Sequence, residues 1–237
     1  MKTIKGACFF CCALPILLLS VMLLADASRM VAKPQGCGGC ECYDQYGNCA
    51  FSCDSPIIID IGGHGFHLTP ASQGVLFDIG GTGHPIQIAW TAPGAQNAFL
   101  ALDRNGNGVV DNGTELFGNF TPQPSSPHPN GFLALAVFDL PENGGNGDGV
   151  IDARDKIFSS LRLWLDANHD GVCQPDELFT LPSKGVDSIS LDYHLSERRD
   201  QFGNLFRYRS LVNPDDPRGT PEEVGRVAYD VFLTKLK

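Results

Sequence analysis

Signatures of several common enzyme classes are missing from this chain of 237 residues. It has no phosphate-binding P-loop, no dinucleotide-binding fingerprint, no His-Glu-x-x-His zinc motif and no Gly-x-Ser-x-Gly nucleophile elbow. Basic residues are also scarce, since 17 Lys and Arg stand against 27 Asp and Glu, for a formal net charge of -10. This shortage argues against nucleic acids and anionic membranes as partners, because both attract basic surfaces.

What the sequence does contain is a twelve-residue calcium-loop pattern from residue 166 to residue 177. Oxygen-bearing side chains occupy positions 1, 3 and 5, a glycine at position 6 permits a sharp turn, and an acid at position 12 can supply two oxygens. Oxygens at this spacing converge on one hard cation. The sequence therefore predicts a Ca2+ site whose ligands are Asp166, Asn168, Asp170, the backbone carbonyl of Val172, and Glu177.

A hexad that begins with Asp and ends with Gly recurs elsewhere in the chain. A second full copy starts at residue 103, and its predicted ligands are Asp103, Asn105, Asn107, Val109, Asp111 and Glu115. A partial copy starts at residue 144, and its predicted ligands are Asn146, Asp148, Val150, Asp152 and Asp155. Glycine replaces the first acid of the partial copy, so Asp139, Glu142 or Asn143 is expected to reach back and supply that ligand.

The copies differ in ligand quality. In the loop at 103 a threonine occupies position 12 and Glu115 follows one residue later, which predicts altered geometry or lower affinity. Two more copies, at Asp60 and Asp78, carry glycine where oxygen ligands would be needed. We interpret those two copies as turns between strands.

The amino terminus has the form of an export signal. Two lysines precede an apolar run from residue 9 to residue 25, and Ala25-Asp26-Ala27 has the small-x-small form of a cleavage site. Cleavage after Ala27 would make residues 1–27 a signal peptide and place the mature protein in the periplasm, at the cell surface or outside the cell. Retention of the apolar run as a membrane anchor is the alternative, and without that run the acidic chain is not expected to bind membranes.

Five cysteines fall between residues 37 and 53. In an exported chain such a cluster predicts disulfides that hold a short segment with no core of its own, so we interpret residues 28–55 as a separate cysteine-rich segment. A zinc knot is the alternative, because Cys37-Gly-Gly-Cys40 and Cys49-Ala-Phe-Ser-Cys53 have ligand-like spacing. Cys173 occupies position 8 of the loop at 166, where a core-facing side chain is expected, and it is predicted to be a buried thiol.

The remaining residues, 56–237, are predicted to form one α+β domain of antiparallel strands and hairpins, with short helices around EF-hand-like calcium loops. Short β-branched runs predict strands near residues 56–60, 74–78, 85–90, 188–193, 205–210 and 226–233. Strands 188–193 and 205–210 are expected to pair as a hairpin about a turn at residues 200–204. Helices are predicted over residues 153–161, from their apolar spacing, and from Pro175 onward.

Two runs of the sequence, Leu102–Gly118 and Leu163–Gly171, resemble the calcium-binding modules of large secreted RTX-type bacterial proteins, and the similarity spans about residues 56–193. In some iron-regulated members of that family, calcium folds the module and an Asp-Pro bond at its amino-terminal border is then cut. By resemblance, the border here is Asp54-Ser55-Pro56, where an inserted serine separates the acid from the proline. The intact Asp-Pro bond of this chain is Asp216-Pro217, far from that border.

Together these observations predict an exported, non-enzymatic calcium-binding protein with a structural or adhesive role, whose loops are folded and stabilised by Ca2+. One alternative is a calcium-triggered self-processing module. Another is a calcium-dependent domain that binds carbohydrate or a surface partner, which would make an extracellular protein or polysaccharide its partner. Trp90 and Trp164 are expected to pack in the core and not to stack on a sugar.

Overall fold

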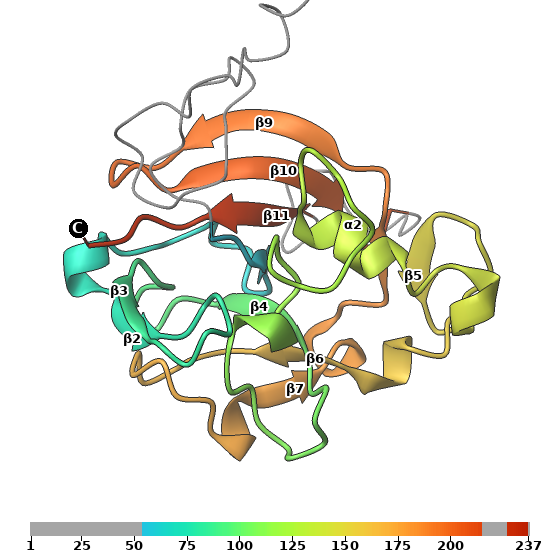
Figure 1. The fold of residues 1–237 in the computed structure, drawn as a ribbon, viewed down its shortest axis with the longest axis horizontal. Coiled ribbons are helices and arrows are strands. Elements are labelled where there is room, and N and C mark those ends of the chain that lie inside the picture. Colours follow the sequence, from blue (N-terminus) through green and yellow to red (C-terminus); the bar gives the residue numbers. More distant parts are fainter. Residues whose placement is uncertain (1–53, 215–226, 237) are drawn as a thin grey trace, which may run out of the picture. The chain divides into compact units, whose positions relative to one another are not determined.

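Seven antiparallel strands form the central sheet of residues 54–214 and 227–236, the part of the chain that this computed structural model describes (Figure 1). In pairing order the strands are β7 (Leu178–Thr180), β6 (Leu161–Trp164), β4 (Asn97–Leu102), β1 (Ile57–Asp60), β11 (Val227–Phe232), β10 (Leu205–Leu211) and β9 (His194–Arg199). The first and last of these in the chain, β1 and β11, lie side by side in the middle of the sheet, with Ile57 opposite Asp230.

Several predictions concern residues outside that description. They are the signal peptide at 1–27, the cysteine cluster at 37–53 and the Asp216-Pro217 bond. The division of the chain into a signal peptide, a cysteine-rich segment and a calcium-binding domain therefore stays a prediction. Cys173 does lie within the described residues, and its unpaired thiol is buried as predicted, with 6% of the residue exposed.

Smaller elements cover the sheet. Strand β2 (Val75–Phe77) pairs with β3 (Ile86–Ile88), and β5 (Val150–Asp152) pairs with β8 (Ser188–Ser190). Within the described residues there is one α-helix, α2 (Gly131–Ala136), which begins where the Asn130 side chain accepts hydrogen bonds from the backbone N–H groups of Phe132 and Leu133. Six 3-10 turns complete the described fold: η1 (Ala71–Gln73), η2 (Gly113–Glu115), η3 (Pro141–Asn143), η4 (Phe158–Ser160), η5 (Pro175–Glu177) and η6 (Pro182–Lys184). None of the helices in this part of the chain has the length and apolarity needed to cross a bilayer.

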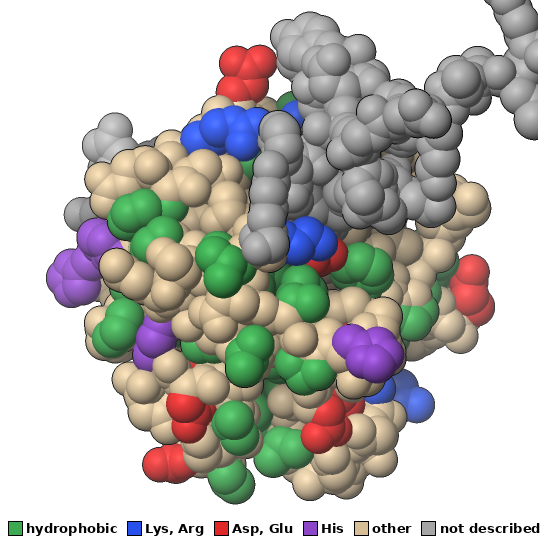
Figure 2. Space-filling model, turned by 60° about the vertical axis from the view of Figure 1, so that its left-hand side comes forward, with side chains coloured by type: hydrophobic (Ala, Val, Ile, Leu, Met, Phe, Trp, Pro, Cys, Tyr) green, Lys and Arg blue, Asp and Glu red, His purple; other side chains and the backbone are tan. Residues whose placement is uncertain are grey.

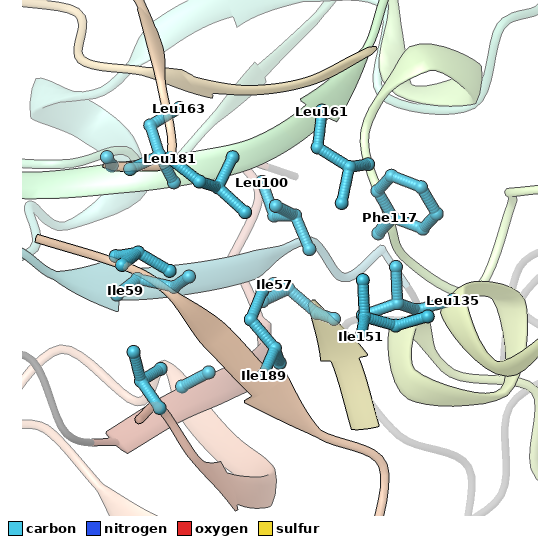
Figure 3. Packing of buried hydrophobic residues seen from close by; sticks show 14 of the residues in the cluster. Ile57, Ile59, Leu100, Phe117, Leu135, Ile151, Leu161, Leu163, Leu181 and Ile189 are labelled. Atoms are coloured by element: carbon cyan, nitrogen blue, oxygen red, sulfur yellow. The ribbon is translucent and has the colours of Figure 1, made fainter. Parts of the chain in front are cut away.

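Apolar side chains pack against both faces of the sheet. In β1, Ile57 and Ile59 face one cluster, which we call the first core, while Ile58 faces the other, which we call the second core. The first core includes Leu135 of α2 and Ile151 of β5 (Figure 3). The second core includes the β2–β3 pair, Trp90 and Trp164. Because both faces are covered, β4 is buried at every residue and, after Asn97, reads as a continuous apolar run.

The predicted α+β class is wrong, because the described fold is mostly antiparallel β-sheet and lacks EF-hand helices. Residues 153–161, predicted as a helix, form turns and η4 and then enter β6. Phe158 and Leu161 both lie in the first core, as their apolar spacing predicted, but Phe158 belongs to the turn η4 and Leu161 to strand β6. Apolar spacing in a short segment does not distinguish these conformations. The helix expected from Pro175 is only the 3-10 turn η5, followed by β7.

The predicted strands agree with the structure more closely than the predicted helices do. Strands expected near residues 56–60, 74–78, 85–90, 205–210 and 226–233 are confirmed as β1, β2, β3, β10 and β11. The predicted hairpin is wrong, because β10 pairs with β9 while β8 pairs with β5. Strand β9 is hard to read from sequence because it forms the sheet edge and five of its six residues are exposed, so it shows no apolar alternation.

Candidate metal centre

Three of the repeated segments form closed loops on this scaffold. We call residues 103–115 loop A, residues 139–155 loop B and residues 166–177 loop C. Loop A follows β4, loop B follows α2, and loop C follows β6. Positions are counted from residue 103 in loop A, from residue 144 in loop B and from residue 166 in loop C. In each loop the residue at position 8 anchors the turn in a core: Val110 (4% exposed), Ile151 (0%) and Cys173 (6%). Loops A and C thereby attach to the second core and loop B to the first.

The first acid of each loop accepts a hydrogen bond from the backbone N–H of the glycine at position 6. The distances from Oδ2 to that nitrogen are 2.8 Å for Asp103 and Gly108, 2.9 Å for Asp139 and Gly149, and 2.9 Å for Asp166 and Gly171. The left-handed φ of these glycines, +86°, +81° and +72°, suits residues without a Cβ. Asp139 therefore takes the structural place of the first acid in loop B, and of the three candidates for the first ligand, Asp139, Glu142 and Asn143, it is the one that accepts from the position-6 glycine.

The last acid of each loop folds back over the turn. Glu177 accepts hydrogen bonds from the backbone N–H groups of Ala167 at 2.8 Å and Gln174 at 3.3 Å. In loop A, Glu115 accepts from Arg104 at 2.9 Å and Asp111 at 2.8 Å. In loop B, Asp155 accepts from Asn146 at 3.2 Å and Asp152 at 2.8 Å. Glu115 thus plays the same structural part as Glu177 although it stands one position later.

The copies at Asp60 and Asp78 are turns, as predicted. Each carboxylate accepts from a glycine five residues on, Gly65 or Gly83, at 2.6 Å. Asp60 ends β1, and the Asp78 turn links β2 to β3. These turns share the first half of the loop pattern but not the amide and carboxylate side chains that follow it in loops A and C.

The polar side chains of loops A and C converge within each loop. In loop A, the amides of Asn105 and Asn107 both donate to Asp111 Oδ2 at 2.7 Å. In loop C, the amides of Asn168 and Gln174 both donate to Asp170 Oδ2 at 2.9 Å. Each loop therefore gathers two amides around one carboxylate, and rotation of an amide would turn its oxygen into the cluster.

Loop B has a charged group in the corresponding place. Arg154 Nη2 lies 2.6 Å from Asp148 Oδ2 and 2.6 Å from Asp152 Oδ2. Hydrogen bonding to the guanidinium lowers the pKa of the Asp152 carboxyl, and the same contacts raise the pKa of Arg154. Asn146 adds an amide hydrogen bond to Asp148 at 3.0 Å.

The predicted position-7 residues, whose backbone carbonyls were expected to be ligands, have different surroundings. Val172 is 59% exposed on loop C, Val109 is partly buried beside the second core, and Val150 lies in β5 opposite Ser190. In residues 54–214 and 227–236 no three His, Cys, Asp or Glu side chains form a group able to hold a metal ion. Most carboxylates of the loops accept hydrogen bonds from backbone N–H groups or side-chain amides and do not face one another. A cation bound in a loop would therefore need amide and backbone carbonyl oxygens among its ligands.

Two buried tryptophans reach loop C from the second core. The indole Nε1 of Trp90 donates to Asp166 Oδ2 at 2.8 Å, and that of Trp164 donates to Glu177 Oε2 at 3.2 Å. Both tryptophans are fully buried, and their rings lie 5.5 Å apart. The prediction that they pack in the core is confirmed, but their contacts with the first and last acids of the loop were not predicted. The second core therefore orients both carboxylates.

His169 connects loop C to neighbouring backbone segments through both of its ring nitrogens. It occupies position 4 with a positive φ of 61°, and its two ring nitrogens lie 2.7 Å from Thr91 O and 2.8 Å from Gln73 O. These contacts tie the loop to η1 and to the segment that follows β3. The sequence contained no signal for them, because Thr91 and Gln73 are distant in the chain.

Two titratable groups of loop C, Asp170 and Cys173, have shifted pKa values. Desolvation by neighbouring atoms acts to raise the pKa of the exposed Asp170, but hydrogen bonds from Val172, Gln174 and Asn168 outweigh it and hold that pKa below its usual value. Burial raises the pKa of Cys173 to about 11, so this thiol is protonated at neutral pH.

Loop C borders solvent. A hollow of about 340 Å³ lies beside it, lined by residues that include Ala167, Asn168, Gln174 and Glu177. On the face shown in Figure 2, acidic side chains are scattered over the top, the right-hand side and the lower part, among apolar side chains. A cation could therefore approach the loop without any rearrangement of the cores.

Comparison with known proteins gives two matches. The family model described as the SPM domain matches residues 57–230. The iron-regulated protein FrpA of Neisseria meningitidis serogroup C is 35% identical over 173 residues, which are 72% of this chain and 15% of FrpA. The chain thus spans about a seventh of the length of that curated relative. These matches confirm the expected relation to RTX-type proteins.

Proposed function

Because the chain belongs to the SPM domain family, we propose that residues 56–237 act as a calcium-binding domain of a secreted or surface protein. Loops A and C would hold Ca2+, which would stabilise the β-rich fold and serve a structural or adhesive role. The similarity to one stretch of an RTX-related protein supports export.

One observation carries the proposal: loop C has oxygen-bearing side chains at positions 1, 3, 5 and 12, and its first and last acids are held by contacts from the second core. Asp166 and Glu177 are buried, and each accepts an indole hydrogen bond from the second core. Supporting contacts of this kind fix the orientation of metal ligands and reduce the entropy lost on binding. Asp166, Asn168, Asp170 and Glu177 would hold the cation with the carbonyl of Val172, and the cation would supply the positive charge that these acids lack.

Calcium would then act mainly on stability. A ligand present at 100 times its dissociation constant stabilises the folded state by about 2.7 kcal/mol per site. Since whole domains are stable by only ~5–15 kcal/mol, two such sites would decide whether the domain is folded. An exported chain could in this way remain unfolded at low calcium and fold where calcium is abundant.

Self-processing receives less support from the border residues. Asp54 is followed by Ser55 and not by proline, and its carboxylate is paired with Lys235 Nζ at 2.6 Å. An acid that attacks its own carbonyl needs a free carboxylate and a reactive following bond. Incubation of the purified chain with Ca2+, followed by a denaturing gel, tests this alternative through the appearance of a second band.

A calorimetric calcium titration of the purified chain, repeated with Mg2+, tests the proposal. We expect two Ca2+ sites and a higher melting temperature in Ca2+ than in EDTA. The variant Asp170→Ala removes an exposed carboxylate from position 5 of loop C and should abolish one site. The matched control Asp176→Asn removes an exposed acid of the same loop from outside the predicted ligand set and should retain both sites. Binding no tighter than that of Mg2+, or equal losses in the two variants, would refute the proposal.

A further inference from the structure

Positions 5 and 9 are bridged by a nitrogen donor in all three loops. An amide makes the bridge in loop A, from Asn107 to Asp111 at 2.7 Å, and in loop C, from Gln174 to Asp170 at 2.9 Å. In loop B the two positions are Asp148 and Asp152, and neither can donate, because both are carboxylates. The bridge there is the guanidinium of Arg154, 2.6 Å from each acid.

These bridges differ in what they can do when a cation arrives. An Asn or Gln amide that rotates exchanges its NH2 group for a carbonyl oxygen, so the same side chain becomes a metal ligand. A guanidinium has five donors, no acceptor and a permanent positive charge. Loop B therefore carries a cation of its own, held by two acids that would otherwise be metal ligands.

The backbone turn that carries Arg154 in loop B also occurs in loop C. Arg154 stands at position 11, two residues after Asp152, as Asp176 stands two residues after Gln174. The turn that carries position 11 is the same in both loops, since Asp155 N donates to Asp152 O at 3.0 Å and Glu177 N donates to Gln174 O at 3.0 Å. Arg154 also holds Asp152 through its Nε at 3.0 Å and its own backbone N–H at 2.8 Å.

We propose that Arg154 is a built-in counter-cation that excludes Ca2+ from loop B. This inference rests on the proposed function only for the number of sites in the wild-type chain. Loop B anchors in the first core through Ile151, whereas loops A and C anchor in the second core through Val110 and Cys173. Calcium would accordingly act on one side of the sheet, while on the other side Arg154 occupies the place between Asp148 and Asp152.

Calcium calorimetry on Arg154→Gln, with Arg209→Gln as the matched control, tests the inference. Arg209 is an exposed arginine of β10 and lies outside all three loops. We expect Arg154→Gln to bind one more Ca2+ per chain than the wild type, and Arg209→Gln to bind the same number. In EDTA, Arg154→Gln should also melt below Arg209→Gln, because Asp148 and Asp152 then repel each other, and saturating CaCl2 should restore it.

The difference between variant and wild type tests Arg154, whereas the wild-type number tests the proposed function. One additional site in Arg154→Gln supports the inference even if the wild type binds no calcium. An equal number in both chains overturns it, whatever that number is. The reciprocal variant Asp176→Arg, which places an arginine at position 11 of loop C, should lose one site and provides a second measurement if Arg154→Gln does not fold. Retention of every site in Asp176→Arg would also count against the inference.

Discussion

Replacement of Trp90 by Phe is a direct test of whether the second core controls loop C. Phe retains most of the ring but removes the indole N–H that donates to Asp166 at 2.8 Å in a fully buried position. A hydrogen bond to a charged group contributes about 1.5–3 kcal/mol, and the smaller ring costs about 1 kcal/mol more in packing. We therefore expect the free energy of unfolding to fall by about 3 kcal/mol in EDTA. The Ca2+ affinity should fall by about tenfold, at the low end for removal of a supporting contact.

Urea denaturation followed by the fluorescence of the remaining Trp164 would measure the stability, and calorimetry would measure the affinity. The matched control is Phe99→Leu. Phe99 is also fully buried and its ring lies 4.4 Å from that of Trp90, but it has no polar atom to offer a carboxylate. This control should lose stability and keep its calcium affinity. Equal calcium affinities for Trp90→Phe and the wild type, or equal losses in the two variants, would refute the reasoning.

Three further predictions follow from single contacts. His169→Ala should lower the melting temperature, and His169→Gly should melt above His169→Ala because a left-handed φ costs a residue with a Cβ ~1 kcal/mol. Burial raises the pKa of Asp230 to about 7, so the folded protein keeps a proton that the unfolded chain releases near pH ~4. The free energy of unfolding should therefore fall as the pH rises from ~4 to about 7. Asp230→Asn, which can still accept from Gly131, should abolish that slope in urea titrations at a series of pH values. Gly113→Ala should cost about 3 kcal/mol or more in urea denaturation, since a Cβ would lie 1.8 Å from Ile79 O.

The loops could be predicted from the sequence more reliably than the elements around them. Each loop is a local structure, in which an acid accepts hydrogen bonds from N–H groups a few residues away, as Asp103 does from Gly106 and Gly108. The flanking elements are decided by distant partners. Leu161, for example, lies in a strand because β6 pairs with β4, and nothing in its own segment distinguishes that strand from a helix.

The same distinction separates the predicted from the unpredicted parts of the candidate site. Asp166 and Glu177 follow from spacing, but the indole of Trp90 arrives from 76 residues away, so no local pattern signals it. The sequence left Asp139 as one of three candidates, because inserted residues separate it from the rest of the repeat and its loop position could not be counted. Arg154 is different, since it stands inside the repeat at position 11, and an alignment of the loops against each other would have shown a basic residue among predicted ligands.

The pairing of β1 with β11 makes folding depend on the order in which the chain becomes available. Strand β1 has β4 and β11 as its neighbours, and β11 in turn connects β10 and β9 to the sheet. A chain that emerges from its amino terminus therefore cannot complete the sheet until residues 227–232 have emerged. Contacts at such long separation along the chain make folding slow. A chain whose last strand is not yet available would therefore lack the pairing in the middle of its sheet.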